Sequence, residues 1–200
     1  MDWDKYDEQF FINPNGIIQQ ANNRYLEILN SFNLLGKKCL DFGCGSGYWV
    51  NYFLEKGAIV AGIDASPMAV ERCRLLYPHC SFQSPTVEGL INFPDSRFDF
   101  VTACYVLQEI FDNAAFKKTV QEIHRVLSGT GKLVVVSNIY PDKRTLHEST
   151  ALGDLYENEG EPALYRFFRG DTMSDVLNDS FICQSRNLGG YSFLEVYAKK

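Results

Sequence analysis

The chain has 200 residues, of which 46% are hydrophobic and 22% are charged, and its formal net charge at pH 7 is −6. These values are typical of one soluble globular domain, and they argue against a protein that binds the nucleic-acid backbone through a basic face. The sequence holds no apolar run of the roughly 18 residues that cross a membrane. Its acidic start, MDWDKYDEQ, is too polar for a signal peptide, so we expect a cytoplasmic protein.

Residues 1–35 precede the first predicted strand. The segment 1–16, which contains Tyr6, carries four aromatic residues and ends in the turn signal Asn-Pro-Asn-Gly. It is either a flap packed on the core or a lid over a ligand. Residues 17–32 place apolar side chains on one helical face, which predicts an amphipathic helix.

A short apolar strand, three alternate glycines and a helical pattern follow one another in the stretch KCLDFGCGSGYW, Lys38–Trp49. Glycine lets the main chain turn sharply and lets a ligand approach it closely. The helix that follows, predicted over Tyr48–Lys56, offers N–H groups and the positive end of its dipole. The pattern favours a nucleotide-like ligand here, and the alternative is an ordinary glycine-rich turn.

The run DFGCGSG resembles the D-x-G-x-G-x-G signature of class I S-adenosylmethionine (SAM) dependent methyltransferases. Tyr48 stands where a dinucleotide-binding loop would have its third glycine. The resemblance implies SAM as the cofactor. It implies that the cofactor contacts in this run are Asp41, Gly43, Cys44, Gly45 and Gly47.

The second predicted strand, Ala58–Ile63, ends at an acid. Asp64 follows Gly47 by 64 − 47 = 17 residues, which is about the spacing at which nucleotide-binding folds place a ribose-binding carboxylate. The alternative is that Asp64 starts the turn before the helix Pro67–Leu76. Ser66 suits the capping position better, which leaves Asp64 free for ribose, with Ala65 beside it.

Two further stretches complete the site that the resemblance implies. After the predicted third strand, Cys80–Gln83, the family contacts adenine, which points to Val87 and Glu88. The fourth strand is predicted over residues 98–104 and ends with Cys104 and Tyr105, at the edge where parallel sheets bind ligands.

A proton acceptor is expected near the end of the fourth strand. Many family members have histidines at the places of Gln108 and Glu109, whereas this chain has none there. Glu109 is therefore either a general base for the acceptor or a solvated acid in the first turn of a helix. Tyr140 and Tyr6 are the other candidates.

The rest of the chain predicts an α/β fold. A helix over Ala114–Leu127, a turn over 128–131 and a buried strand over Lys132–Ser137 continue the alternation. Residues 139–170 interrupt it and are interpreted as a partly helical substrate cover. A short helix over Asp171–Asn178 precedes two strands that meet at Gly189-Gly190 as an antiparallel hairpin. We therefore expect one domain, 1–200, with a doubly wound seven-stranded, mainly parallel sheet, a C-terminal antiparallel hairpin and helices on both faces.

The resemblance implies methyl transfer from SAM to an oxygen or nitrogen atom of a small molecule. Nucleic-acid bases are disfavoured because the place after the fourth strand reads Ala-Cys-Tyr-Val, without the Pro-Pro pair of enzymes that methylate exocyclic amines. We expect no metal, since zinc-ligand spacing is absent, and reduced cysteines. The alternatives are a non-catalytic SAM-binding subunit and, less favoured, a nicotinamide-dependent oxidoreductase.

Overall fold

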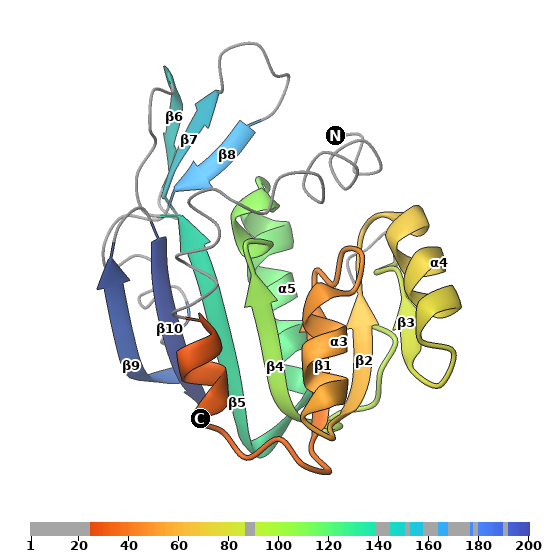
Figure 1. Cartoon of the computed structure of the whole chain (residues 1–200). Coiled ribbons are helices and arrows are strands. Elements are labelled where there is room, and N and C mark those ends of the chain that lie inside the picture. The colour runs from red at the N-terminus through yellow and green to blue at the C-terminus, as the bar shows by residue number, and fades with distance from the viewer. Residues whose placement is uncertain are drawn as a thin grey trace.

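The structure is a computed structural model, and it describes residues 25–86, 91–138, 145–150, 153–157, 164–167, 177, 180–189 and 192–200. Figure 1 shows the whole chain. In chain order the elements are β1 (Lys38–Phe42), α3 (Tyr48–Glu55), β2 (Ile59–Ile63), α4 (Pro67–Leu76), β3 (Ser81–Gln83), β4 (Phe98–Cys104), η1 (Leu107–Glu109), α5 (Asn113–Val126), β5 (Leu127–Asn138), β6 (Thr145–Thr150), β7 (Gly153–Glu157), β8 (Leu164–Phe167), β9 (Phe181–Gly189) and β10 (Ser192–Lys199).

The main sheet has seven strands in the order β3-β2-β1-β4-β5-β10-β9. β1 lies near its centre and pairs in parallel with β2 on one side and β4 on the other. β10 joins β5 antiparallel and pairs antiparallel with β9. The expected fold class, a mainly parallel seven-stranded sheet with a C-terminal antiparallel hairpin, is confirmed.

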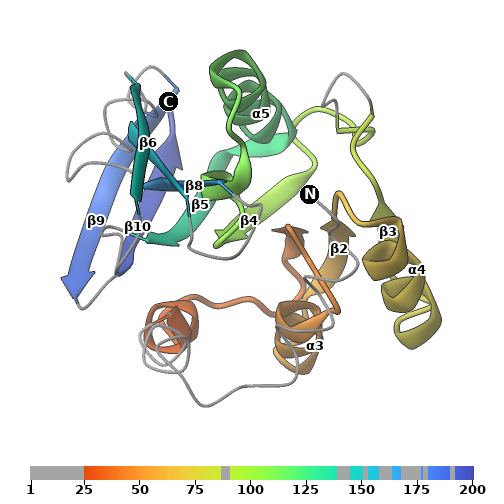
Figure 2. The same ribbon diagram turned by 90° about the horizontal axis from the view of Figure 1, so that it is seen from above.

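Helices cover both faces of this sheet (Figure 2). α5 lies on one face, and α3 lies on the other together with a helical turn at residues 25–30. Because successive side chains of a strand point to opposite faces, β1 contributes to two separate apolar clusters. The α5 side contains Leu40, Phe42, Phe116, Val120 and Ile123. The α3 side contains Tyr25, Leu29, Cys39, Val50 and Phe53.

The helices begin where side chains can satisfy their first N–H groups. The Ser66 hydroxyl accepts a hydrogen bond from the Ala69 N–H at 3.1 Å and caps α4, with Pro67 at the first helical position. The Asp112 carboxylate caps α5 by accepting from the Ala115 N–H at 2.7 Å. The capping role predicted for Ser66 is therefore confirmed.

A second, three-stranded antiparallel sheet forms within residues 139–170, in the order β6-β7-β8. It lies beyond the carboxyl ends of β4 and β5 (Figure 1). The expectation of a partly helical segment is wrong for the residues that the structure describes. Its threonines and tyrosines favour strands, and Tyr156 pairs with Tyr165 across β7 and β8.

Two boundaries on β5 and the hairpin differ from the predicted ones. The expected turn over 128–131 lies inside β5, which begins at Leu127 and whose register against β4 shifts between Phe98 and Phe100. β9 extends to Gly189, which pairs with Ser192, so residues 190–191 make the connection. The helix expected at 171–178, apart from residue 177, and the first half of the one expected at 17–32 lie outside the described residues.

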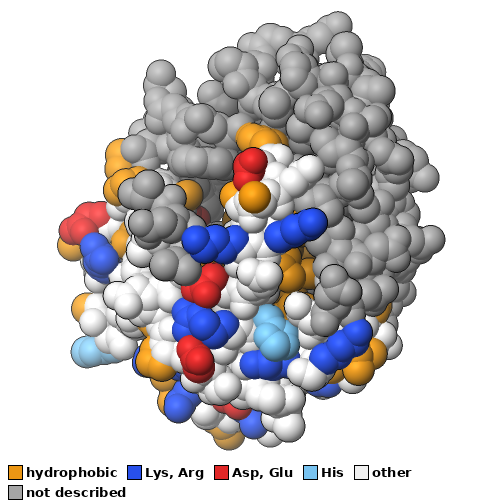
Figure 3. Space-filling model, turned by 180° about the vertical axis from the view of Figure 1, so that it is seen from behind, with side chains coloured by type: hydrophobic (Ala, Val, Ile, Leu, Met, Phe, Trp, Pro, Cys, Tyr) orange, Lys and Arg blue, Asp and Glu red, His pale blue; other side chains and the backbone are white. Residues whose placement is uncertain are grey.

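Three further features of the structure concern the cysteines, the surface charge and the lengths of the helices. All six cysteines have free thiols, as expected. In the described part of the face in Figure 3, lysine and arginine side chains lie near acidic ones, so this part is not uniformly basic. Within the described residues, none of the helices combines the length and the apolar character that crossing a bilayer requires.

Candidate cofactor and acceptor site

The loop between β1 and α3 is shaped by its glycines. Gly43, Gly45 and Gly47 have positive φ values of 81°, 48° and 90°, which residues other than glycine rarely adopt. A Cβ atom on Gly43 would lie 2.6 Å from the Cβ of Val106, the second residue after β4. Gly43 therefore allows the loop to pack directly against the segment that follows β4.

Most N–H groups of this loop donate hydrogen bonds to other groups of the protein. The N–H groups of Gly43 and Cys44 donate to the Ile63 carbonyl at 2.8 and 2.9 Å, and the Gly47 N–H donates to the Cys44 carbonyl. The sequence suggested that the loop offers its main chain to a ligand. These three N–H groups are occupied, because the end of β2 accepts from two of them and the turn itself accepts from the third, and binding of the cofactor by this loop stays a prediction.

Side chains of α4 hold the loop from its other side. The Cys73 thiol donates to the Gly45 carbonyl, and the Tyr77 hydroxyl donates to the Gly47 carbonyl, both at 3.3 Å. A hydrogen bond with Cys73 also raises the pKa of the Cys44 thiol. Together with the bonds to β2, these contacts fix the loop before any cofactor binds.

Asp64 occupies the predicted place at the carboxyl end of β2, but it is not free. Its Oδ2 accepts from the Gly45 N–H at 2.8 Å, and its Oδ1 accepts from the Ser66 N–H at 2.9 Å. Ala65 is exposed beside it. A carboxylate offers about four lone-pair positions, so these two bonds leave Asp64 able to accept ribose hydroxyls as well.

Asp41 is fully buried at the carboxyl end of β1. Its Oδ1 accepts from the Thr102 hydroxyl at 3.0 Å, while its Oδ2 has no hydrogen-bond partner among the described residues. Burial raises the pKa of Asp41 to about 7, the Thr102 bond lowers it and the charge of Asp64 adds to the rise. A buried carboxylate oxygen of this kind is stabilised by a donor or a cation. The ammonium group of SAM is such a donor, so Asp41 fits the cofactor that the loop suggests.

The carboxyl end of β4 turns sharply after Cys104. Tyr105 has a φ of 57°, in the left-handed region that costs a residue with a side chain about 1–3 kcal/mol. Its N–H donates to the Val136 carbonyl at 2.8 Å, which holds the turn against β5. This turn directs the chain into η1 at the edge where the glycine loop also lies.

Glu109, at the end of η1, is 8% exposed and Gln108 is 3% exposed. The alternative of a solvated acid is therefore wrong. The Ser137 hydroxyl donates to Gln108 Oε1 at 2.8 Å, and Gln108 Nε2 donates to Glu109 Oε1 at 3.2 Å. β8 of the second sheet lies in contact with η1. Glu109 is thus a buried carboxylate at the carboxyl edge, below the segment predicted to cover the substrate.

The predicted site residues fall into two groups, those that the structure brings together and those that it does not describe. The structure brings Asp41, Asp64 and the glycine loop together at the ends of β1 and β2, with Tyr105 and Glu109 after the neighbouring β4. Tyr6, Tyr140, Val87 and Glu88 lie outside the described residues. Sequence reasoning missed the contributors from other elements, which are Cys73, Tyr77, Thr102 and Ser137, and it considered Gln108 only as a place where the family often has histidine. Of these only Ser137 had a signal, as a polar residue ending an apolar strand.

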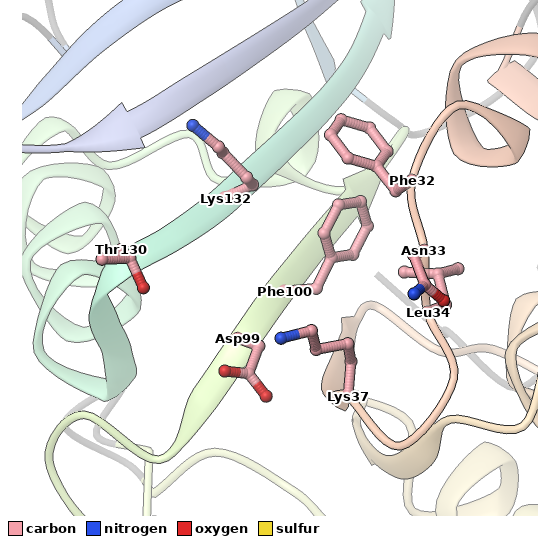
Figure 4. A pocket seen from close by; sticks show the side chains of 8 residues that line it. All are labelled: Phe32, Asn33, Leu34, Lys37, Asp99, Phe100, Thr130 and Lys132. Carbon is pink, nitrogen blue, oxygen red and sulfur yellow. The ribbon is translucent and has the colours of Figure 1, made fainter.

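A small pocket lies at the other end of the sheet (Figure 4). Its volume is about 150 Å³, which is below the roughly 300–1,000 Å³ of typical ligand pockets. Its lining residues are Phe32, Asn33, Leu34, Lys37, Asp99, Phe100, Thr130 and Lys132. None of the predicted site residues lines it. Among the described residues, no three His, Cys, Asp or Glu side chains are grouped so that they could hold a metal ion.

Comparison with known proteins agrees with this geometry. Residues 40–135 match the family described as a methyltransferase domain. An uncharacterised methyltransferase of Synechocystis sp. is 34% identical over 101 residues, which are 50% of this chain and 47% of that protein. A ubiquinone biosynthesis O-methyltransferase of Alkalilimnicola ehrlichii is 35% identical over 86 residues, 41% of this chain and 35% of the relative. The chain thus matches less than half the length of these relatives.

A solved structure extends the similarity to most of the chain. The 1,6-didemethyltoxoflavin-N1-methyltransferase of Burkholderia thailandensis was solved with its substrate and S-adenosylhomocysteine (SAH). It aligns with a TM-score of 0.69 at 21% identity, over 90% of this chain and 78% of that one. At this identity the likeness concerns the fold. The glycine loop, the two acids and the matched family together show that the chain belongs to the class I SAM-dependent methyltransferases, whose cofactor is SAM.

Proposed function

We propose that this protein transfers the methyl group of SAM to an oxygen or nitrogen atom of a small-molecule acceptor, with Glu109 as the proton acceptor. The observation that carries the proposal is the buried Glu109 carboxylate, which follows the carboxyl end of β4. Its helix η1 contacts β8, and β4 lies beside β1, the strand that leads into the glycine loop. The relatives support both atom types, since one is an O-methyltransferase and a structural neighbour is an N-methyltransferase.

Each residue has a separate task in this proposal. SAM, when bound, supplies a methyl group on a positive sulfonium. Asp64 would accept the ribose hydroxyls, and Asp41 Oδ2 would accept from the ammonium group. Glu109 would accept the proton that an acceptor O–H or N–H loses as the new bond forms, and it would then release that proton to water.

The second sheet, β6 to β8, is proposed to cover the acceptor. It lies beyond the ends of β4 and β5, and its strand β8 contacts η1 (Figure 1). A cover at this place would exclude water from the carboxylate and hold the acceptor in line with the methyl group. In this proposal the cover and the main sheet act as one domain.

Substitution of Glu109 by Gln tests the proton acceptor. Purified protein would be incubated with SAM carrying a labelled methyl group and a panel of phenols, heteroaromatic N–H compounds and amines. We expect the variant to transfer methyl groups at least ~100-fold more slowly than the wild type, because general base catalysis contributes about that much. Its affinity for SAH should stay unchanged, since Glu109 does not belong to the proposed cofactor contacts.

The matched control is Glu71→Gln, which neutralises an exposed acid on α4. It should transfer at the wild-type rate. Wild-type turnover by the Glu109 variant would reject its role as the base. Binding of SAH without transfer to any compound in the panel would favour the alternative of a non-catalytic SAM-binding subunit.

A further inference from the structure

A chain of buried hydrogen bonds joins the ends of β4 and β5. It runs from the Ser137 hydroxyl to Gln108 Oε1 at 2.8 Å, and from Gln108 Nε2 to Glu109 Oε1 at 3.2 Å. Ser137 is 0% exposed and Gln108 is 3% exposed, so water does not compete readily for these bonds. A buried amide between a hydroxyl and a carboxylate is unusual where packing is the only role. Apolar side chains would fill the same space without the free-energy cost of burying polar groups.

The charge on Glu109 decides the direction of every bond in the chain. An ionised carboxylate only accepts hydrogen bonds, so the amide must turn its Nε2 toward Glu109. Its Oε1 then faces Ser137, whose hydroxyl can rotate to donate. The opposite orientation of the amide would place its carbonyl oxygen against a carboxylate oxygen. The Ser137 hydroxyl then satisfies the amide oxygen in the orientation that the ionised form of Glu109 requires.

We propose that Ser137 and Gln108 are positioning residues that hold Glu109 ionised and in one orientation toward the acceptor. This inference rests on the proposed function for the role of Glu109, but the bonding itself can be tested without an acceptor. A donor to the charged form lowers the pKa of a carboxyl group, which opposes the rise that burial causes. A base poised in this way is ionised before the acceptor binds, so it can take a proton from a hydroxyl or an amine.

The test follows the carboxyl group directly. Full-length protein labelled with glutamate carrying ¹³C at the side-chain carboxyl would be titrated by NMR, and Glu109→Gln would identify the Glu109 signal. In Gln108→Leu we expect the Glu109 pKa to rise by about one pH unit, because the amide donor to its carboxylate is lost. In Ser137→Ala we expect a smaller rise, because the amide keeps its donor to Glu109 but its buried Oε1 loses its hydrogen-bond partner.

Gln121→Leu is the matched control, since it makes the same exchange on the exposed face of α5. It should leave the Glu109 pKa where it is in the wild type. SAH affinity, measured for every variant, reports folding. Should Gln108→Leu not fold, Ser137→Ala still decides the question because it removes a single oxygen atom.

Two outcomes distinguish the positioning role of Ser137 and Gln108 from the proposed role of Glu109 as the base. An identical Glu109 titration in the wild type, Gln108→Leu and Ser137→Ala would overturn the positioning role, whatever Glu109 does in catalysis. A shifted titration supports it, even if Glu109→Gln still transfers methyl groups and the proposed base is therefore wrong.

Discussion

Two segments at the same edge of the sheet are held in different ways. The loop after β1 is fixed mainly through its main chain, by bonds from Gly43, Cys44 and Gly45 to the end of β2. The segment after β4 is fixed largely by side chains, in the bonds that link Ser137, Gln108 and Glu109. Both face the space beyond the carboxyl ends of the strands, where open parallel sheets bind ligands.

The two segments therefore depend on particular side chains to different degrees. Bonds made by the main chain form with almost any sequence, provided that glycines allow the backbone path. The matched family segment, 40–135, includes this loop and also Gln108 and Glu109. The bonds after β4 need particular side chains, one of which comes from Ser137, beyond that segment. In the proposed function the first region binds the cofactor, and the second holds the carboxylate that takes the proton of the acceptor.

The largest effect is expected for Gly43→Ala. A Cβ atom there would meet Val106 at 2.6 Å and the φ of 81° would strain it. Together these should lower the free energy of unfolding by about 3 kcal/mol. Urea denaturation measures this, with Gly129→Ala as the control because a Cβ at Gly129 meets nothing within 4 Å. Equal losses for both variants would show that the loop tolerates a side chain.

Asp64→Ala should weaken SAH binding by about 2 kcal/mol, or roughly thirtyfold. The variant loses the charged acceptor proposed for ribose and the bond that holds the Gly45 N–H. Titration calorimetry measures the affinity. Asp99→Ala is the control, because Asp99 accepts from the Lys38 N–H at the opposite end of the strands. Unchanged SAH affinity in Asp64→Ala would remove this residue from the cofactor site.

Asp41→Asn should change how stability depends on pH. The pKa of Asp41 is raised to about 7 by burial, whereas an unfolded aspartate has a pKa near 3.9. Between these values the folded wild type keeps a proton that the unfolded chain releases. Its free energy of unfolding should therefore fall as pH rises from about 4 to 7, by up to about 1.4 kcal/mol per pH unit.

The Asn variant lacks this group, so it should become more stable relative to the wild type as pH rises. Urea denaturation at pH 5 and pH 7 gives the comparison. Saturating SAH should flatten the wild-type slope, because its ammonium group would stabilise the ionised form. The same slope in both proteins would mean that Asp41 is ionised throughout this range.

The smallest effect is expected for Tyr77→Phe, which removes the 3.3 Å bond to the Gly47 carbonyl. Stability should fall by roughly 0.5–1 kcal/mol, the net worth of a neutral hydrogen bond. Tyr52→Phe loses a comparable bond, to Asn30 at 3.0 Å, on the outer face of α3. Both variants should lose similar stability, but only Tyr77→Phe should also weaken SAH binding. Equal SAH affinities would show that the Tyr77 hydroxyl does not support the loop for cofactor binding.

Local patterns in the sequence were enough to predict much of this architecture. The alternation of strands and helices, the positive-φ glycine loop, the Ser66 cap and the C-terminal hairpin each depend on residues close together in the chain. Such features follow from periodicity, capping and turn chemistry, which act over a few residues. The acids at the ends of β1 and β2 could be placed for the same reason, since a strand end is a local property.

What the acids bind was decided only by the tertiary structure. Asp64 meets Gly45 and Asp41 meets Thr102 because parallel pairing brings the ends of distant strands together. The burial of Glu109 and its link to Ser137 depend on β4 lying beside β5. The sheet of β6 to β8 was missed because aromatic and threonine-rich segments carry weak periodicity, and partner strands settle their structure. Spacing along the chain therefore predicted where the site lies, while contacts across the sheet set its chemistry.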